Sequence, residues 1–151
     1  MEAKIYHIYN RGNHKEHICF KLKDYYVLKK IITKRLKDSC IDLLLLCIMP
    51  NHFHFVIGTY KPEHIPTAMR DIGRNYTVYM NRKYNLVGHL FQGPYKRKSV
   101  NNLVYFRVLV EYIRKNPQDI SSVMGGICKS FENEELVQYY ELLLGRKVLH
   151  L

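Results

Sequence analysis

The amino-acid sequence predicts a single α+β domain over residues 1–151, of the ferredoxin-like or RRM-like split-βαβ type. Two observations carry this prediction. Segments with the composition of strands and segments with helical periodicity alternate in the order strand, helix, strand, strand, helix, strand. Two further helical segments follow them. Such a chain is expected to form an antiparallel sheet with helices on one face, a second face left for a ligand, and extra helices at its C-terminal end.

The first half of the chain is expected to form a strand, a helix and a hairpin. Residues 4–9 are aromatic and β-branched and end at the turn-forming sequence Asn-Arg-Gly-Asn. Asp24 is the expected N-cap of a helix that runs to about residue 40, because apolar residues recur there at helical spacing. Residues 41–49 form an apolar run of strand length, and the Pro-Asn pair after it turns the chain into a strand over 52–60.

The second half of the chain is expected to be mostly helical. Asn101 or Asn102 caps a helix that runs to Asn116, where Pro117 stops it. The remaining expected elements are a helix over 66–84 that is rich in Arg, Tyr and Asn, a strand over 95–100 with a basic face, and a last helix over 132–144.

The charge of the chain is uneven. Its formal net charge is +11, and the excess of Lys and Arg lies in residues 1–115, whereas residues 116–151 are slightly acidic. A positive field of this size favours a polyanionic partner, nucleic acid first and an anionic membrane surface second. A basic surface that serves only solubility is the alternative.

Other features of the composition narrow the class of protein. No apolar run is long enough to span a bilayer, and the N-terminal residues lack the pattern of a signal peptide. We therefore expect a cytoplasmic protein without a membrane partner. The cysteines Cys19, Cys40, Cys47 and Cys128 show no paired spacing, which predicts reduced, packing residues rather than a structural zinc site.

Two histidines stand one residue apart in the segment MPNHFHFVI, residues 49–57. Side chains at positions i and i+2 of a strand point to the same face, so His52 and His54 are expected side by side. Two imidazoles leave most of a metal's coordination sphere open, and a metal site therefore needs a further ligand. Two half-buried histidines satisfied by their neighbours are the alternative.

The helix expected over residues 101–116 offers a candidate partner for this pair. Tyr112 and Asn116 are one helical turn apart, so their phenol and amide project together. A tyrosine at the edge of the core followed by a capping asparagine is the alternative. Another stripe of the same helix, about 100° or more around its axis, is apolar and is expected to be buried. It is made of Leu103, Phe106, Val110 and Ile113.

Four motifs together resemble one known family. MPNHFHFVI, YHIYNRG at residues 6–12, GHLFQGPYK at 88–96 and YIRKNP at 112–117 occur in the order and at the spacing of the one-tyrosine HUH transposases of single-stranded insertion sequences. The branch that includes the REP-associated tyrosine transposases is the most similar. The resemblance covers about residues 4–118 and leaves 119–151 as a C-terminal helical extension.

The resemblance implies an HUH fold and a DNA endonuclease and strand transferase that uses Mg²⁺ or Mn²⁺. His52 and His54 match the metal-binding pair, Tyr112 the nucleophile, and Asn116 a third ligand found in some relatives. Attack by Tyr112 on single-stranded DNA beside a hairpin would leave a covalent 5′-phosphotyrosine and a 3′-hydroxyl, in a prokaryotic protein that acts at the nucleoid. Relatives work as dimers or as monomers; an apolar C-terminal helix favours a homodimer.

Basic and aromatic side chains interleave in two segments, as in surfaces that bind single strands. Tyr76, Tyr79 and Tyr84 lie among the arginines of the helix expected over 66–84. A solvated face, or tyrosines of the core, is the alternative for each of these residues. The candidates for DNA contacts are Arg11, Arg70, Arg74, Arg82, Lys83, Tyr95, Lys96, Arg97 and Lys98.

Three other functions are the alternatives to a transposase. A domesticated protein could bind DNA hairpins without cleaving them. A metal-dependent nuclease could use His52, His54 and water, in which case the phenol of Tyr112 would be dispensable. An RNA-binding module would need exposed aromatic residues on the sheet and no metal.

Overall fold

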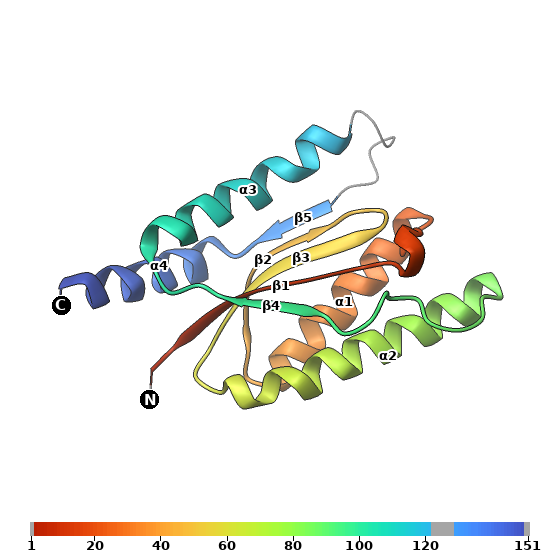
Figure 1. Ribbon diagram of the computed structural model, residues 1–151, viewed down its shortest axis with the longest axis horizontal. Coiled ribbons are helices and arrows are strands. Elements are labelled where there is room, and N and C mark those ends of the chain that lie inside the picture. Colours follow the sequence, from red (N-terminus) through yellow and green to blue (C-terminus); the bar gives the residue numbers. More distant parts are fainter. Residues whose placement is uncertain (1, 122–128, 150–151) are drawn as a thin grey trace.

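The computed structural model describes residues 2–121 and 129–149, and the side chains of all of these except 116–121, 129–130 and 147–149. Figure 1 shows the arrangement of its elements. Two short 3₁₀ helices cover Asn13–Lys15 and Pro62–His64. The other elements are β1 (Lys4–Arg11), α1 (Leu22–Asp38), β2 (Asp42–Ile48), β3 (His52–Thr59), α2 (Ile65–Tyr84), β4 (Lys96–Ser99), α3 (Leu103–Ser121), β5 (Lys129–Glu132) and α4 (Glu134–Leu149).

The five strands form one antiparallel sheet in the order β4-β1-β3-β2-β5. The first four strands and α1 and α2 make the split-βαβ arrangement, which confirms the predicted fold class. The expectation that the second face of the sheet is left for a ligand is wrong, because α3 and α4 bury apolar residues against it. β5 is an edge strand that the sequence did not predict. It comes from the segment just before α4, and its residues pair with β2.

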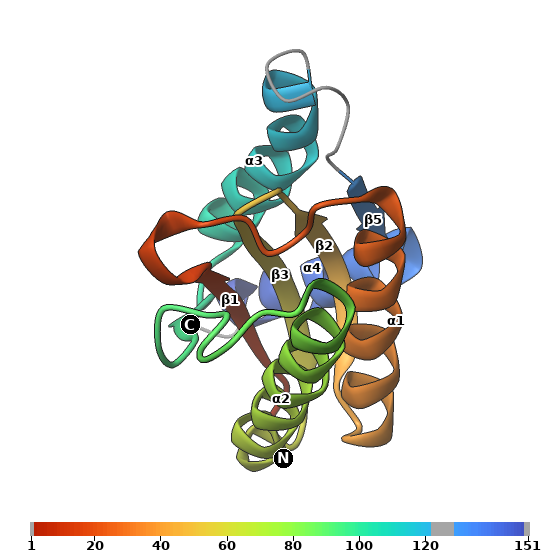
Figure 2. The ribbon, with the colours of Figure 1, turned by 90° about the vertical axis from the view of Figure 1, so that its right-hand side faces the viewer.

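The sheet separates two apolar cores. α1 and α2 pack on one face and α3 and α4 on the other, as Figure 2 shows. Alternate side chains of β3 enter the two cores: Phe53 and Phe55 join the core under α1 and α2, whereas Val56 joins the core under α3 and α4. By the same alternation, His52 and His54 lie on the α3 side of the sheet.

The start of α3 agrees with the sequence-based prediction and its end does not. The side chain of Asn102 accepts a hydrogen bond from the Tyr105 N–H at 2.7 Å, which confirms Asn102 as a cap. The expected stop at Pro117 is wrong, because the helical backbone continues to Ser121. The local preference against helix at a proline is only one contribution, and the position of this helix is decided by its buried face, where Phe106 and Ile113 are fully enclosed.

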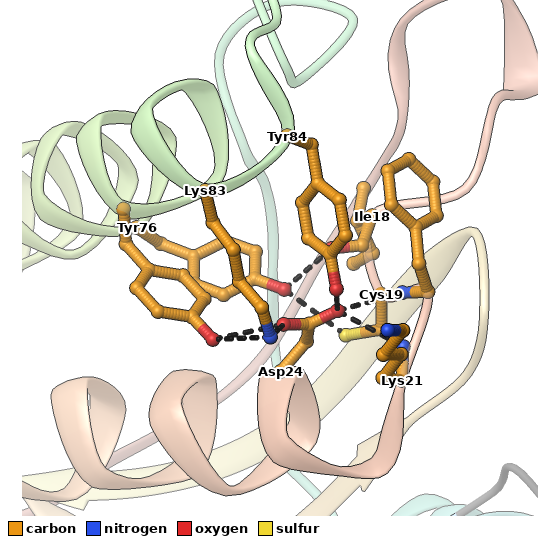
Figure 3. Close-up of polar contacts among 9 residues, drawn as sticks. Ile18, Cys19, Lys21, Asp24, Tyr76, Lys83 and Tyr84 are labelled. Carbon is orange, nitrogen blue, oxygen red and sulfur yellow. Dashed lines mark hydrogen bonds and ion pairs between the residues drawn. The ribbon is translucent and has the colours of Figure 1, made fainter.

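Asp24 joins α1 to α2 instead of acting as an N-cap (Figure 3). The helix begins two residues earlier, and the buried Asp24 carboxylate accepts the backbone N–H groups of Phe20 and Lys21. From α2 it accepts hydrogen bonds from the phenols of Tyr79 and Tyr84, at 2.8 and 2.6 Å, and from Lys83 Nζ at 2.8 Å. One carboxylate therefore holds two helices and a loop together.

Two smaller expectations concern cysteines and membranes. Cys19 and Cys47 are buried packing residues as expected, whereas Cys40 is exposed and Cys128 lies outside the described residues. Within the part of the chain that the structure describes, no helix has the length and apolar character that crossing a membrane requires.

Candidate active site

A tight hairpin presents the histidine pair at the edge of the α3 side of the sheet. The Met49 N–H donates to the His52 carbonyl at 2.8 Å, which closes the turn at Pro50-Asn51 between β2 and β3. The imidazole rings of His52 and His54 lie with their centroids 5.1 Å apart and their planes perpendicular. The sequence-based expectation of two neighbouring imidazoles on one face is met.

The chain after β1 folds onto this turn. The Gly12 N–H donates to the Asn51 carbonyl at 2.8 Å, and the Ile18 N–H donates to the Pro50 carbonyl at 2.6 Å. At Gly12 a Cβ atom would lie 2.0 Å from the Glu16 carbonyl oxygen, so no larger residue fits without moving backbone. The turn that carries the histidines is therefore held from outside by backbone hydrogen bonds.

Strand β1 adds His7 and Tyr9, which the sequence analysis did not single out, and places the predicted Arg11 beside them. In the β1–β3 register Arg11 lies opposite His52 and Tyr9 lies opposite His54. His7, two residues earlier, is buried, and its Nε2 lies 3.0 Å from His54 Nδ1. The alternation of β1 places His7, Tyr9 and Arg11 on one face, but only the pairing register brings that face to the histidine pair.

Tyr112 on α3 reaches the same place. Its ring stands edge-on to that of His54, with centroids 6.0 Å apart, and its side chain is 52% exposed. On the opposite side of the helix, Phe106, Val110 and Ile113 are buried as predicted, which fixes the rotation of α3 about its axis. The phenol therefore stands beside the histidine pair and open to solvent.

The protein surroundings keep these histidines neutral. Burial, together with smaller contributions from the neighbouring His52 and His7, lowers the pKa of His54 to about 3. Burial also lowers the pKa of His7 to about 4, with a contribution from Lys98, and burial lowers the pKa of His52 as well. At neutral pH the rings carry no charge, which is the form in which imidazole binds metals.

The ring nitrogens of His52 and His54 supply two of the ligands that a divalent metal needs. The Nδ1 of His52 lies 2.7 Å from Asn51 Oδ1, and that of His54 lies against His7, so the Nε2 atoms are the ones left for a cation. Among the described residues, no group of three or more His, Cys, Asp or Glu side chains could hold a metal. Asn116, the expected third ligand, has a side chain outside the described set.

A cleft of about 460 Å³ opens beside the histidine pair. Arg11 and Lys96 bring positive charge to its lining, and Tyr9 and Phe53 bring aromatic surface. Asn10 helps to shape it, because its amide donates to the Gly93 carbonyl at 3.1 Å. The cleft is also lined by His52, His54, Gln92, Gly93 and Pro94.

The structure divides the candidate DNA contacts into separate groups. Arg11 and Lys96 line the cleft, and Lys98 lies over the ring of Tyr9, 5.8 Å from its centroid. Arg97 lies over the ring of Tyr6, whose contacts are with the core of the other face, and Tyr95 packs partly against that same core. The remaining candidates lie on α2, which packs on the face of the sheet opposite to α3. They are Arg70, Arg74, Arg82 and Lys83.

The tyrosines of α2 belong to the protein interior more than to an exposed surface. Tyr76 is fully buried, and its phenol donates to the Ile18 carbonyl. Tyr79, Lys83 and Tyr84 hydrogen-bond to Asp24. The interleaving of basic and aromatic residues on this helix therefore arises mostly from packing, and its exposed arginines are what remains for a phosphate backbone.

Solved structures share the fold at low sequence identity. A REP-associated tyrosine transposase bound to a REP hairpin aligns with a TM-score of 0.63 and 18% identity, over 78% of this chain and 67% of that one. A candidate transposase from Deinococcus radiodurans R1 gives 0.56 and 16%, over 76% and 92%. A bacterial tRNA(His) guanylyltransferase-like protein in complex with GTP gives 0.54 and 14%, over 95% and 91%. One fold thus serves different chemistries.

The family comparison is more specific than the fold. A search among curated proteins finds no match. The model of the family described as "Transposase IS200 like", however, matches residues 2–116, which include the hairpin of His52 and His54 and the helix of Tyr112. The chain belongs to the IS200-like transposase family.

Proposed function

We propose that this transposase cleaves and rejoins single-stranded DNA through a covalent bond to Tyr112. The observation that carries the proposal is the position of the Tyr112 ring, 6.0 Å from the ring of His54, half-exposed at the histidine pair. A phosphodiester placed beside these two side chains, on their solvent-exposed side, would have both the nucleophile and the metal-binding pair within reach.

The reaction that we propose is a phosphoryl transfer in which one P–O bond forms as another breaks. The Tyr112 oxygen attacks the scissile phosphorus and loses its proton, the P–O3′ bond breaks, and the leaving oxygen takes up a proton. The products are a 5′-phosphotyrosine and a free 3′-hydroxyl. Another 3′-hydroxyl can reverse the step on a new strand, so no nucleotide cofactor is needed.

The residues of the chain would divide the remaining work. His52 and His54 would hold Mg²⁺ or Mn²⁺, with Asn116 as a further candidate ligand, and such a cation supplies charge stabilisation at the scissile phosphate. Arg11 and Lys96, which line the cleft, would hold flanking phosphates. Tyr9, directly opposite His54 in the sheet, offers a face on which a base can stack.

We propose single-stranded DNA with hairpin ends as the substrate. A structural neighbour was solved with a REP hairpin, and the net charge of +11 suits a nucleic-acid partner. The exposed arginines of α2 are candidates for contacts to the paired stem, whereas the charge of Lys83 is bound to Asp24. Arg97 and Lys98 would extend the basic surface from β4. Sedimentation distinguishes the monomer from the homodimer.

A labelled single-stranded hairpin oligonucleotide tests the proposal. In the presence of Mg²⁺ or Mn²⁺ we expect a protein–DNA adduct that survives denaturing electrophoresis. Tyr112→Phe should abolish the adduct and retain DNA binding. Tyr105→Phe, on the same helix and also half-buried near the core, is the matched control and should retain the adduct.

The alternatives give different products in the same experiment. A nuclease that uses water would release cleaved DNA without an adduct and would tolerate Tyr112→Phe. A domesticated binding protein would retain the hairpin without cleaving it. An adduct that persists in Tyr112→Phe would assign the nucleophile to another residue.

A further inference from the structure

His7 has no part in the chemistry described above, although it is buried against the proposed metal site. Its side chain is only 8% exposed, and its ring stacks on that of His54 with centroids 5.2 Å apart and an interplanar angle of 20°. Its Nε2 lies 3.0 Å from His54 Nδ1, which is the distance of a hydrogen bond.

The short distance between the two ring nitrogens sets a constraint on their protons. A neutral imidazole has one N–H and one lone pair, so one nitrogen of this contact donates and the other accepts. If His54 donates from Nδ1, its Nε2 keeps a lone pair. If His7 donates instead, His54 carries its proton on Nε2 and cannot offer that atom to a cation.

The tautomer of His52, the other histidine of the pair, follows from its own hydrogen bond. Its Nδ1 lies 2.7 Å from the side-chain oxygen of Asn51, and an amide oxygen only accepts hydrogen bonds. His52 therefore donates from Nδ1 and keeps its lone pair on Nε2. A two-imidazole site that uses the same nitrogen of both rings requires an equivalent acceptor beside His54 Nδ1, and His7 is the group in that position.

We infer that His7 is a positioning residue: it accepts the Nδ1–H of His54 and thereby fixes the tautomer and the ring orientation that present His54 Nε2 to a cation. The tautomer itself is a property of the metal-free protein. Only its consequence for metal affinity rests on the proposed function. Acceptors of this kind behind metal-binding histidines typically change metal affinity 10–100-fold.

Two substitutions separate the hydrogen bond from the packing of the ring. His7→Gln removes the imidazole but supplies an amide oxygen as acceptor, whereas His7→Phe keeps an aromatic ring and removes the acceptor. His64→Gln is the matched control, because His64 also bonds through Nδ1, at 2.9 Å from the Ser39 carbonyl, but lies past the other end of β3.

The first measurement is the tautomer of His54 in metal-free protein, read from long-range proton–nitrogen NMR spectra. We expect Nδ1–H in the wild type, in His7→Gln and in His64→Gln, and a mixture of tautomers in His7→Phe. A wild-type His54 protonated on Nε2 would overturn the inference, and so would a tautomer unchanged in folded His7→Phe. If His7→Phe does not fold, the wild-type and His7→Gln spectra decide.

The second measurement is the affinity for Mn²⁺ by calorimetry. We expect a roughly 10–100-fold weaker affinity in His7→Phe and a change of only a few-fold in His7→Gln. Equal loss in both variants would mean that ring packing, and not the accepted hydrogen bond, supports the site, and would overturn the inference. A wild type that binds no Mn²⁺ would refute the proposed metal site, while the tautomer experiment still decides the role of His7.

Discussion

Arg114 on α3 binds the carboxylate of Glu132 on β5 through two of its nitrogens, Nε at 2.9 Å and a terminal nitrogen that lies closer. Its other terminal nitrogen contacts Glu111 at 2.9 Å. Because Arg114 is two residues from Tyr112, this ion pair holds the turn that carries the phenol against the chain's own sheet. A second pair, Arg107–Glu141, joins α3 to α4 one to two turns earlier.

Reversing the charge of this pair should affect the reaction more than the stability. Both side chains are partly exposed, so Arg114→Glu should lower the free energy of unfolding by only about 1 kcal/mol. We expect the Tyr112 adduct to form clearly more slowly in Arg114→Glu. Adding Glu132→Arg should restore the rate only in part, because the new carboxylate at position 114 still faces Glu111. Arg107→Glu is the control, since it weakens α3 packing away from Tyr112. Equal rates in the wild type and in all three variants would show that the pair does not position the phenol.

The anchoring of α3 also predicts which active site Tyr112 serves. His54 and Tyr112 of one chain already lie together, so each chain should react with its own tyrosine. A mixture of His54→Ala and Tyr112→Phe proteins should therefore form no adduct, whatever the oligomeric state measured by sedimentation. Restored activity in the mixture would show that the helix serves a partner subunit.

Asp24 should make stability depend on pH in the acid range. Burial alone would raise its pKa, but hydrogen bonds from Lys83, Tyr84 and two backbone N–H groups hold the pKa well below its usual range. Since the pKa is lower in the folded state, the ionised group stabilises the fold above about pH 4 and loses this effect as the pH falls further. Asp24→Asn should cost about 2–4 kcal/mol at pH 7 and flatten the acid dependence in urea titrations.

Asp38→Asn is the matched control for that experiment. Asp38 is exposed at the end of α1, where loss of its charge should change the free energy of unfolding by less than about 0.5 kcal/mol. Similar acid titrations of Asp24→Asn and the wild type would show that the Asp24 network contributes little in its charged form.

Gly12 should tolerate no side chain. Gly12→Ala would force the Glu16 carbonyl away from its position and displace the loop that bonds to the Pro50-Asn51 turn. We expect a lower melting temperature and weaker Mn²⁺ binding. Gly73→Ala is the control: outside the adjacent backbone of its own helix, no atom lies within 4 Å of the added Cβ. Alanine in the middle of α2 should stabilise by about 0.5–1 kcal/mol.

Lys96 should contribute one phosphate contact near the scissile bond. Lys96→Gln is expected to weaken binding of a single-stranded oligonucleotide and to reduce the slope of log affinity against log salt by about one. Lys37→Gln removes the same charge from the exposed end of α1 and is the control. Identical salt slopes for Lys96→Gln and the wild type would remove Lys96 from the DNA path.

Local patterns were sufficient for much of the candidate site. The period of two along β3 placed His52 and His54 on one face, and helical periodicity placed Tyr112 opposite a buried stripe. The order and spacing of the four motifs indicated the family. Pro117 is the counterexample, because the local preference of proline predicts a helix end there, whereas the folded chain continues the helix to Ser121.

Periodicity within a segment does not predict contacts between segments that are distant in the sequence. His7 and Tyr9 reach the site through the register of β1 against β3, which one sequence does not specify. Lys83 reads as a free basic residue in the sequence, yet in the fold its charge is bound to Asp24, 59 residues away.

The sequence by itself determined which side chains share a face, because the periods of strand and helix follow from backbone geometry alone. Tertiary structure decided which faces meet: it brought the phenol of Tyr112 to His54, and His7 behind that ring. The physical reason is that strand pairing and the burial of two separate cores depend on the whole chain at once, and no short segment contains that information.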